Sequence, residues 1–189
     1  FSAVHKAPLS SGETLVVFGL GPVGLTALLM GKARGARCVG IDISPYRIDL
    51  AKRLSGETIL DAKDVDPVQA VADLTDGKGA SGVVECSGSS TARTQTTAVA
   101  ARHATIVIVG AGADEISLNP TDLIRKALTI RGNAVYSMQA YYEAIEFLMR
   151  HSIPLDDMVT HRFRIDQAVE AFALFDQGET GKVIFDWDA

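Results

Sequence analysis

The feature that most constrains this chain is an apolar strand that leads through a glycine-rich turn into a helix. A strand is predicted over Thr14–Phe18, and the turn after it reads Gly19-Leu20-Gly21-Pro22-Val23-Gly24, which has the spacing G-x-G-x-x-G. In such a unit the first glycine permits a tight turn, the second leaves room for a phosphate, and the third lets the helix pack closely on the strand. The spacing alone occurs by chance, but the flanking strand and helix make it informative. The turn therefore predicts a diphosphate site at a helix N-terminus.

Strands and helices alternate along most of the chain. Apolar runs without polar alternation predict strands that are buried on both faces. These runs are Thr14–Phe18, Arg37–Ile43, Gly82–Cys86, Ala104–Val109 and Leu128–Gly132, with Thr58–Leu60 as a shorter candidate. Helical spacing lies between them, over Pro22–Arg34, Pro45–Leu54, Pro67–Leu74, Ser90–Ala101 and Met138–Arg150. The alternation requires right-handed crossovers and predicts an α/β fold with a doubly wound, parallel, six-stranded sheet, the Rossmann fold.

The two ends of the chain lie outside this alternation. Phe1–Pro8 has the character of a helix end, and the chain begins with Phe rather than Met, so we expect a piece of a longer protein. Near the C-terminus, Val159–Ile165 and Lys182–Trp187 predict two short strands around a helix over Asp166–Asp176. Helical spacing within that helix predicts one buried apolar stripe, formed by Val169, Phe172 and Phe175.

Composition and charge exclude several classes of protein. The 189 residues are 47% hydrophobic and 22% charged, as in ordinary globular domains. The net charge is -5 and the basic residues are interleaved with acids, so we expect no nucleic-acid partner. The uncharged stretch Thr14–Gly31 is interrupted by glycines and Pro22, so we expect no membrane span. Cys38 and Cys86 lie far apart in apolar runs, and no signal peptide pattern precedes them, so we expect reduced thiols and a cytoplasmic location.

An acidic residue, Asp42, ends the second predicted strand. It follows the glycine-rich turn by about 20 residues, where a carboxylate can accept hydrogen bonds from adenosine ribose hydroxyls. Because a 2′-phosphate would meet this carboxylate, the position favours NAD over NADP. Arg47 could tolerate a 2′-phosphate, so a strict preference stays open. The alternative role for Asp42 is to cap the helix that begins at Pro45, although Ser44 is better placed for that.

Further motifs stand at the ends of the other predicted strands, and together they resemble one family. They are Gly40-Ile41-Asp42, Gly82-Val83-Val84-Glu85-Cys86-Ser87-Gly88, Ile106-Val107-Ile108-Val109-Gly110, Arg131-Gly132-Asn133 and Gly181-Lys182-Val183-Ile184. With the glycine-rich turn, the series resembles the zinc-type medium-chain dehydrogenase/reductase family, in the branch of alcohol, polyol and threonine dehydrogenases. The resemblance covers nearly the whole chain, and the Glu-Cys-Ser-Gly turn is its most specific element.

The resemblance implies a site for NAD that is assembled from several strand ends. By position, the residues at the pyrophosphate are Gly19, Leu20, Gly21, Pro22, Val23, Gly24 and Lys182. The resemblance places Asp42 and Arg47 at the ribose, and Ile43 and Ser87 beside the adenosine. It places Val109, Gly110 and Ala111 at the nicotinamide amide, and Asn133 and Ala134 at the strand edge that completes the nicotinamide site.

The resemblance also implies what this sequence lacks. In the family, the catalytic zinc, its Cys, His and Glu ligands and most of the substrate pocket belong to an N-terminal GroES-like domain. The four histidines and two cysteines here have no ligand spacing, so we expect zinc only in that absent domain and no catalytic or metal-binding residue in this chain. Glu85 is expected to be a sheet-end carboxylate satisfied by backbone N–H groups. We expect one NAD(P)-binding domain over residues 1–189, with residues 1–12 and 152–189 partly forming the junction with the absent domain.

The favoured hypothesis is an oxidoreductase that transfers hydride between NAD and a secondary alcohol, polyol or amino alcohol, with this chain binding the cofactor and inactive alone. The alternative is a non-catalytic NAD-sensing module, because a fold does not fix a function. A methyltransferase is disfavoured by the third glycine and the strand order.

Leu128–Gly132 is expected at the sheet edge, which favours a homo-oligomer, a dimer or tetramer, in the full protein. These residues do not identify the substrate.

Overall fold

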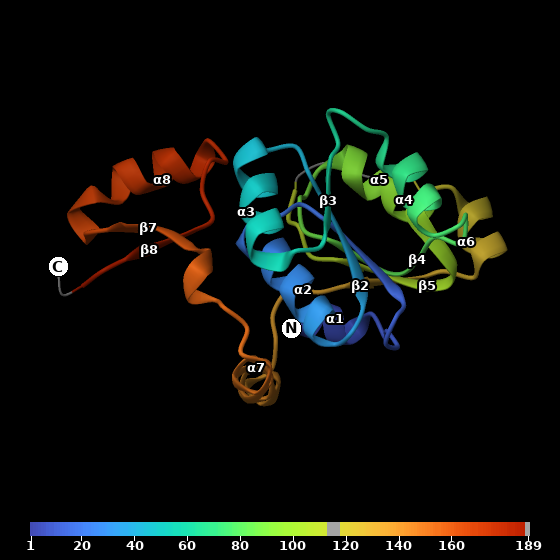
Figure 1. Ribbon diagram of the computed structural model, residues 1–189, viewed down its shortest axis with the longest axis horizontal. Coiled ribbons are helices and arrows are strands. Elements are labelled where there is room, and N and C mark those ends of the chain that lie inside the picture. The colour runs from blue at the N-terminus through green and yellow to red at the C-terminus, as the bar shows by residue number, and fades with distance from the viewer. Residues whose placement is uncertain (113–117, 188–189) are drawn as a thin grey trace.

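A computed structural model describes residues 1–112 and 118–187, and its centre is a six-stranded parallel sheet (Figure 1). The strand order is β3-β2-β1-β4-β5-β6, and every neighbouring pair is parallel. The order reverses between β1 and β4, which is where ligands bind at the carboxyl ends of such sheets. The strands are β1 Thr14–Phe18, β2 Arg37–Asp42, β3 Thr58–Asp61, β4 Ala80–Glu85, β5 Ala100–Ile108 and β6 Thr129–Gly132. The predicted doubly wound α/β fold is confirmed.

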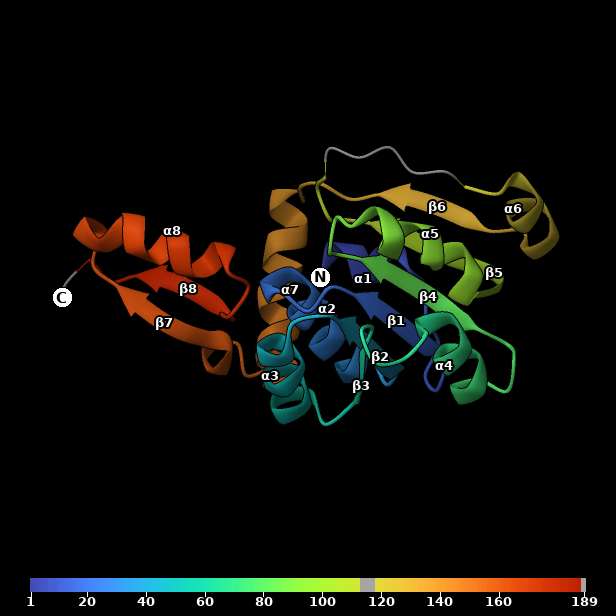
Figure 2. The same ribbon diagram turned by 90° about the horizontal axis from the view of Figure 1, so that it is seen from above.

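Helices cover both faces of the sheet (Figure 2). Leu15 and Val17 of β1 pack on one face with α1, α2 and α3, whereas Val16 and Phe18 pack on the other with α4 and α5. The central strands are therefore buried on both sides, as their apolar sequences predict. The helices of the main domain are α1 Ser2–Lys6, α2 Pro22–Ala33, α3 Pro45–Ser55, α4 Pro67–Leu74, α5 Ser90–Val99, α6 Pro120–Lys126 and α7 Met138–His151.

Proline and a polar cap begin several of these helices. Ser44, Asp66 and Asn119 each accept a hydrogen bond from a first-turn amide, and a proline follows each of them. A proline costs little in the first turn, because its missing N–H would have no helical partner there. The helix α6 was missed in the sequence analysis although it has both signals, since it spans only 7 residues and buries none of them.

The edge strand β6 corrects one expectation. The apolar run at Leu128–Gly132 predicted a strand buried on both faces, yet all four residues of β6 are exposed. The reason is its position, because β6 pairs only with β5 and ends the sheet. The expectation that this strand lies at the edge is confirmed.

A small C-terminal unit stands beside the main domain (Figure 1). Its two parallel strands, β7 Val159–Phe163 and β8 Lys182–Phe185, form a separate sheet, and α8 Ala168–Asp176 connects them. The predicted strands and helix are thus confirmed, but the predicted buried stripe on α8 is wrong. Val169 is 86% exposed and Phe172 64% exposed, because no other element of the described chain covers that side of α8.

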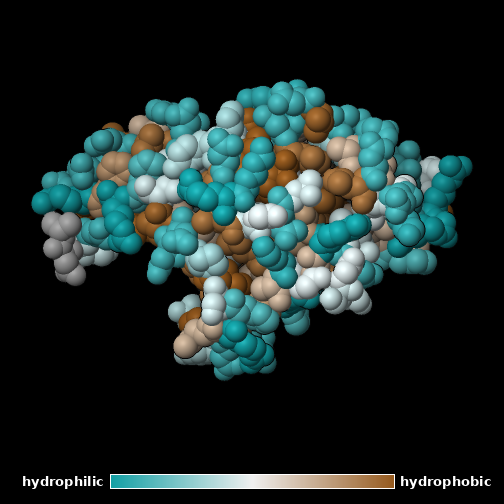
Figure 3. Space-filling view, viewed as in Figure 1, coloured by the Kyte–Doolittle hydropathy of each residue, from teal (hydrophilic) through white to brown (hydrophobic). Residues whose placement is uncertain are grey.

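Apolar surface remains visible on the face drawn in Figure 3, between α3 and α5 and in smaller patches on the C-terminal unit. Among the described residues, no helix combines the length and the apolar character needed to cross a bilayer.

Candidate functional site

The glycine-rich turn is closed by contacts that leave no room for side chains at two of its positions. Gly19 has φ +80°, and a Cβ there would lie 2.7 Å from the backbone of Ser87. A Cβ on Gly24 would lie 1.7 Å from the carbonyl oxygen of Gly19. The first glycine therefore brings the turn against the end of β4, and the third brings α2 against the turn, as the motif predicts.

The middle glycine is different, because the space beside it is open. A Cβ on Gly21 would meet only the end of the Arg47 side chain, at 3.7 to 3.8 Å, which is ordinary contact. Gly21 is the N-cap of α2 and Pro22 follows it. The first intrahelical bond is donated by the Leu25 amide to the Gly21 carbonyl, so the Val23 and Gly24 amides precede it and have no helical acceptor. Bare main-chain donors at a helix N-terminus suit a diphosphate.

Asp42 is buried at the end of β2, and its carboxylate binds the backbone on both sides. Its Oδ2 accepts a hydrogen bond from the Leu20 amide at 2.5 Å. Its Oδ1 accepts from the Ile43 and Ser44 amides at 2.7 and 2.8 Å. A carboxylate offers about four acceptor positions, so the bonds described leave capacity for a ligand hydroxyl. The cap of α3 is Ser44, as expected.

A cavity of about 440 Å³ lies at the reversal of the strand order and joins these groups. It brings together six of the predicted residues, Gly19, Gly21, Asp42, Ile43, Arg47 and Ser87. Its other lining residues are Phe18, Ile41, Ala62, Cys86, Ser89, Thr91, Ala92 and Gln95.

The wall that α5 contributes to this cavity was not predicted from the sequence. Thr91 and Gln95 are four residues apart, so they share one helix face, and a polar pair at that spacing directly after the Ser87 turn is the signal that could have identified them. Cys86 is partly buried and also lines the cavity. Burial, and to a smaller extent the nearby Glu85 carboxylate, raise the pKa of the Cys86 thiol to about 12. Cys86 is therefore a neutral thiol in this wall.

The residues predicted for the nicotinamide side do not line this cavity and follow the carboxyl ends of β5 and β6. The Val109 and Gly110 amides both donate to the Glu85 carbonyl, at 2.8 and 2.9 Å. The Asn133 amide donates to the Ile108 carbonyl, and the Ser2 hydroxyl donates to Asn133 Oδ1 at 2.8 Å. The two remaining predicted residues of this group are exposed, and they are Ala111 and Ala134.

Lys182 is not brought to the glycine-rich turn. It lies on β8 and lines a second hollow of about 480 Å³, together with Phe172, Phe175 and Trp187. The loop before β8 approaches the neighbourhood of the cavity, because the Ser44 hydroxyl donates to the Gly178 carbonyl at 2.9 Å and a Cβ on Gly178 would lie 3.9 Å from the guanidinium of Arg47.

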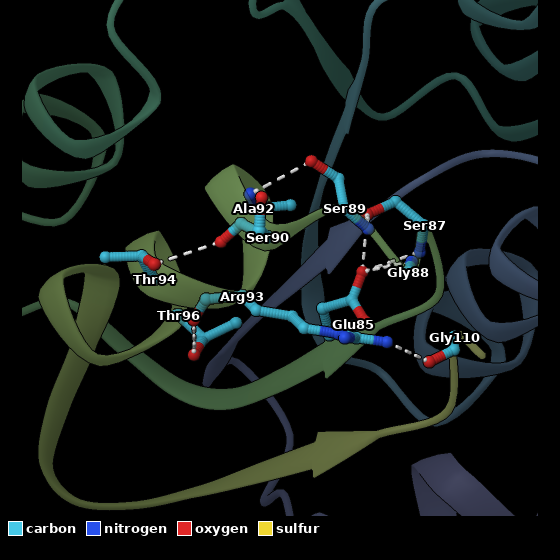
Figure 4. Close-up of polar contacts among 10 residues, drawn as sticks. All are labelled: Glu85, Ser87, Gly88, Ser89, Ser90, Ala92, Arg93, Thr94, Thr96 and Gly110. Carbon is cyan, nitrogen blue, oxygen red and sulfur yellow. Dashed lines mark hydrogen bonds and ion pairs between the residues drawn. The ribbon is translucent and has the colours of Figure 1, made fainter. Parts of the chain in front are cut away.

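A buried carboxylate, Glu85, organises the turn after β4 (Figure 4). Its Oε1 accepts hydrogen bonds from the Ser87 and Gly88 amides at 2.7 and 2.9 Å and from the Ser87 hydroxyl. Its Oε2 lies 3.6 Å from Nε of Arg93, which is also buried. The expected satisfaction by backbone N–H groups is confirmed, and the arginine partner was missed. No group of three or more His, Cys, Asp or Glu side chains among the described residues is placed to hold a metal ion.

Comparison with known proteins identifies the family of this chain. Residues 22–150 match the family model described as zinc-binding dehydrogenase. The chain belongs to the zinc-binding dehydrogenase family. It is 31% identical over 188 residues to an L-threonine 3-dehydrogenase of Bacillus licheniformis, a match that covers 97% of this chain and 54% of that protein. It is 34% identical to a 5-exo-hydroxycamphor dehydrogenase of Pseudomonas putida, over 95% of this chain and 52% of that protein.

Solved structures of this family have the same fold. The structure of 2R,3R-butanediol dehydrogenase from Bacillus subtilis has a TM-score of 0.85 and 27% identity, over 96% of this chain and 53% of that one. An alcohol dehydrogenase from Thermotoga maritima has a TM-score of 0.88 and 26% identity, over 97% and 52%. The chain therefore spans about half the length of the zinc-binding dehydrogenases that it matches. The suspected membership of the zinc-type dehydrogenase family is confirmed.

Proposed function

We propose that this chain binds NAD(H) in the cavity between β1, β2 and β4, and that it is the cofactor-binding domain of a zinc-type alcohol dehydrogenase-like oxidoreductase. The observation that carries the proposal is the joint geometry of the turn and Asp42. Gly21, which is the N-cap of α2, and the buried carboxylate border the same cavity, and the carboxylate is itself bonded to the Leu20 amide within the turn.

The cavity fits the parts of a dinucleotide in order. The open space at Gly21 and the unpaired amides of α2 suit the pyrophosphate, with the Arg47 guanidinium next to them. Asp42 retains capacity for a ribose hydroxyl. Ile43 is 57% exposed and lines the same cavity as Ser87, which gives the adenosine an apolar contact and a polar one. A negative charge at Asp42 disfavours a 2′-phosphate, so NAD is favoured over NADP.

The nicotinamide half would then extend toward the ends of β4, β5 and β6. Backbone groups of Val109, Gly110 and Ala111, and the strand edge at Asn133 and Ala134, are the proposed contacts there. When bound, the nicotinamide supplies or accepts the hydride. This chain's own part is to bind the cofactor and orient it.

For the whole protein we propose hydride transfer between NAD and a secondary alcohol, polyol or amino alcohol. The support is the family and the alcohols named for its relatives, threonine, 5-exo-hydroxycamphor and butanediol. The described residues do not form a metal site, so we propose that zinc and the catalytic residues lie in the portion that the relatives have and this chain does not cover. We further propose that residues 1–12 and 152–189 contribute to the junction with that portion. The full protein is proposed to be a homo-oligomer.

A titration of NADH fluorescence tests the binding proposal, with Gly21→Ala as the diagnostic variant. The added methyl group meets no backbone in the free protein, so the variant should fold normally. It would occupy the space proposed for the pyrophosphate, and we expect NADH affinity to fall by about tenfold or more, equivalent to about one lost charged hydrogen bond.

The matched control is Gly132→Ala, because a Cβ at Gly132 meets nothing within 4 Å. This control should bind NADH as the unmodified chain does. Absence of NADH binding by the unmodified chain at millimolar cofactor would refute the proposal, and equal binding by both variants would remove the pyrophosphate from the turn.

A further inference from the structure

The ion pair between Glu85 and Arg93 lies between two loops that come from different strands (Figure 4). Glu85 holds the turn after β4 through the Ser87 and Gly88 amides. Arg93 reaches from the first turn of α5 to the other loop, where its Nη2 donates to the Gly110 carbonyl at 2.8 Å. The pair therefore joins the loop after β4 to the loop after β5.

Glycines in the two loops allow the loop after β4 and the loop after β5 to pack closely. A Cβ on Gly88 would lie 2.3 Å from the carbonyl oxygen of Ala111, and one on Gly110 would lie 2.3 Å from the Gly88 amide and 2.9 Å from Glu85 Oε2. A Cβ on Gly112 would lie 2.5 Å from the Gly88 carbonyl oxygen and 3.0 Å from Arg93 Nη2. The backbones of the two loops thus touch directly, with the charged pair packed against the contact.

Stability alone gives little reason for charges at this place. Both side chains are almost fully buried, at 0% and 8% exposure. Moving a carboxylate and a guanidinium out of water is costly, and apolar residues of similar volume often stabilise a core equally well. A charged pair instead fixes the orientation of the groups around it, because a guanidinium and a carboxylate bond their partners only in certain directions. Here the bonded groups are loop amides and a loop carbonyl.

We propose that Glu85 and Arg93 are positioning residues that hold the turn after β4 against the loop after β5, at the spacing needed to receive the nicotinamide half of the cofactor. The inference rests on the proposed binding of NAD(H). Glu85 and Arg93 do not line the cavity and act through the Ser87–Gly88 turn and the Val109–Gly110 backbone. Of the proposed adenosine contacts, only Ser87 is bonded to Glu85, through the Oε1 atom that a glutamine would retain. Asp42 and Ile43 lie on the other side of β1, at the end of β2.

The test compares two ligands on each variant of the 189-residue chain. NADH contains the nicotinamide half and ADP-ribose lacks it, so the ratio of their affinities reports the nicotinamide contacts alone. Glu85→Gln keeps the oxygen that accepts from Ser87 and Gly88, and it turns an NH₂ group toward Arg93, so the ion pair is lost while the Ser87 turn keeps its bonds. The double variant E85Q/R93M removes both charges and the bond to Gly110, so it avoids leaving an unpaired buried charge and protects folding.

We expect NADH affinity to fall by about tenfold in both variants, while ADP-ribose affinity stays within about twofold of the unmodified chain. The control Glu146→Gln, an exposed glutamate on α7, should change neither. A merely structural role would lower both affinities together through loss of folded protein, and an unchanged ratio in the folded double variant would overturn the inference. So would an unmodified chain that binds NADH no tighter than ADP-ribose. If the unmodified chain binds neither ligand, the proposed function fails and the inference fails with it.

Discussion

Replacing Asp42 by Asn tests whether one carboxylate holds both the glycine-rich turn and the start of α3. The two oxygens of Asp42 accept from opposite sides, Oδ2 from the Leu20 amide and Oδ1 from the Ile43 and Ser44 amides. An asparagine amide has one acceptor oxygen, so it keeps the Leu20 bond or the other two, and its NH₂ group then faces an N–H donor. In the better orientation, a single buried bond to a charged acceptor is lost.

The loss of that bond sets the expected magnitude. Hydrogen bonds to charged groups contribute about 1.5 to 3 kcal/mol, so we expect the free energy of unfolding to fall by about 2 to 3 kcal/mol. Urea unfolding followed by circular dichroism measures this change, since a stability difference shifts the midpoint at constant slope. The same variant should bind NADH less tightly, because the Leu20 amide belongs to the proposed pyrophosphate turn.

Asp49→Asn is the matched control, because Asp49 is exposed on α3 and its substitution should change the free energy of unfolding by less than about 0.5 kcal/mol. If Asp42→Asn unfolded at the same urea concentration as this control, the Asp42 carboxylate would not stabilise the contact between the glycine-rich turn and β2.

Two further predictions concern the glycine-rich turn and the buried thiol of Cys38. Gly24→Ala would place a Cβ 1.7 Å from the Gly19 carbonyl oxygen, so the backbone must shift. We expect the free energy of unfolding to fall by about 2 to 4 kcal/mol and NADH binding to be lost. The control Gly132→Ala should change neither quantity. Burial raises the pKa of Cys38 to about 12, against about 8.5 in an unfolded chain. The unfolded state releases this proton first, so the stability contributed by the neutral thiol is complete below about pH 8.5. It is lost progressively toward pH 12, by about 1.4 kcal/mol at pH 9.5. Urea unfolding at pH 7.5 and 9.5 should show that decline, and Cys38→Ala should reduce it; an equal decline in the variant would contradict the assignment.

Much of the fold could be predicted from the sequence, because the signals for the central strands are local. The run Leu15–Phe18 is apolar at every position, which suits only a strand covered on both faces, and the glycine spacing after it defines a turn of one kind. The exposure of β6 could not be predicted in the same way. Whether an apolar run becomes a central or an edge strand depends on how many neighbours it has, which is a property of the assembled sheet.

The parts of the candidate site that one short segment supplies could be predicted from the sequence. The parts where distant segments meet could not. Asp42 and Gly21 follow from strand ends and motif spacing. The hydrogen bond from Ser44 to Gly178 joins residues separated by most of the chain, and no local sequence pattern predicts it. Lys182 illustrates the converse error, because its motif resembles the family but its strand belongs to the second sheet and faces another hollow.

The two strand-end carboxylates have the same construction, and this accounts for the location of the cavity. Asp42 ends β2 and Glu85 ends β4, the two neighbours of β1, and each accepts amides from the turn that follows its own strand. Each also reaches a second segment, the Leu20 amide for Asp42 and Arg93 for Glu85. Chains leave the sheet in opposite directions on either side of β1, so the turns there would separate without such connections. The carboxylates that hold these turns therefore end the two neighbours of β1, on either side of the strand where the dinucleotide is proposed to lie, and Asp42 holds the turn proposed for the pyrophosphate while Glu85 holds the loops proposed for the nicotinamide.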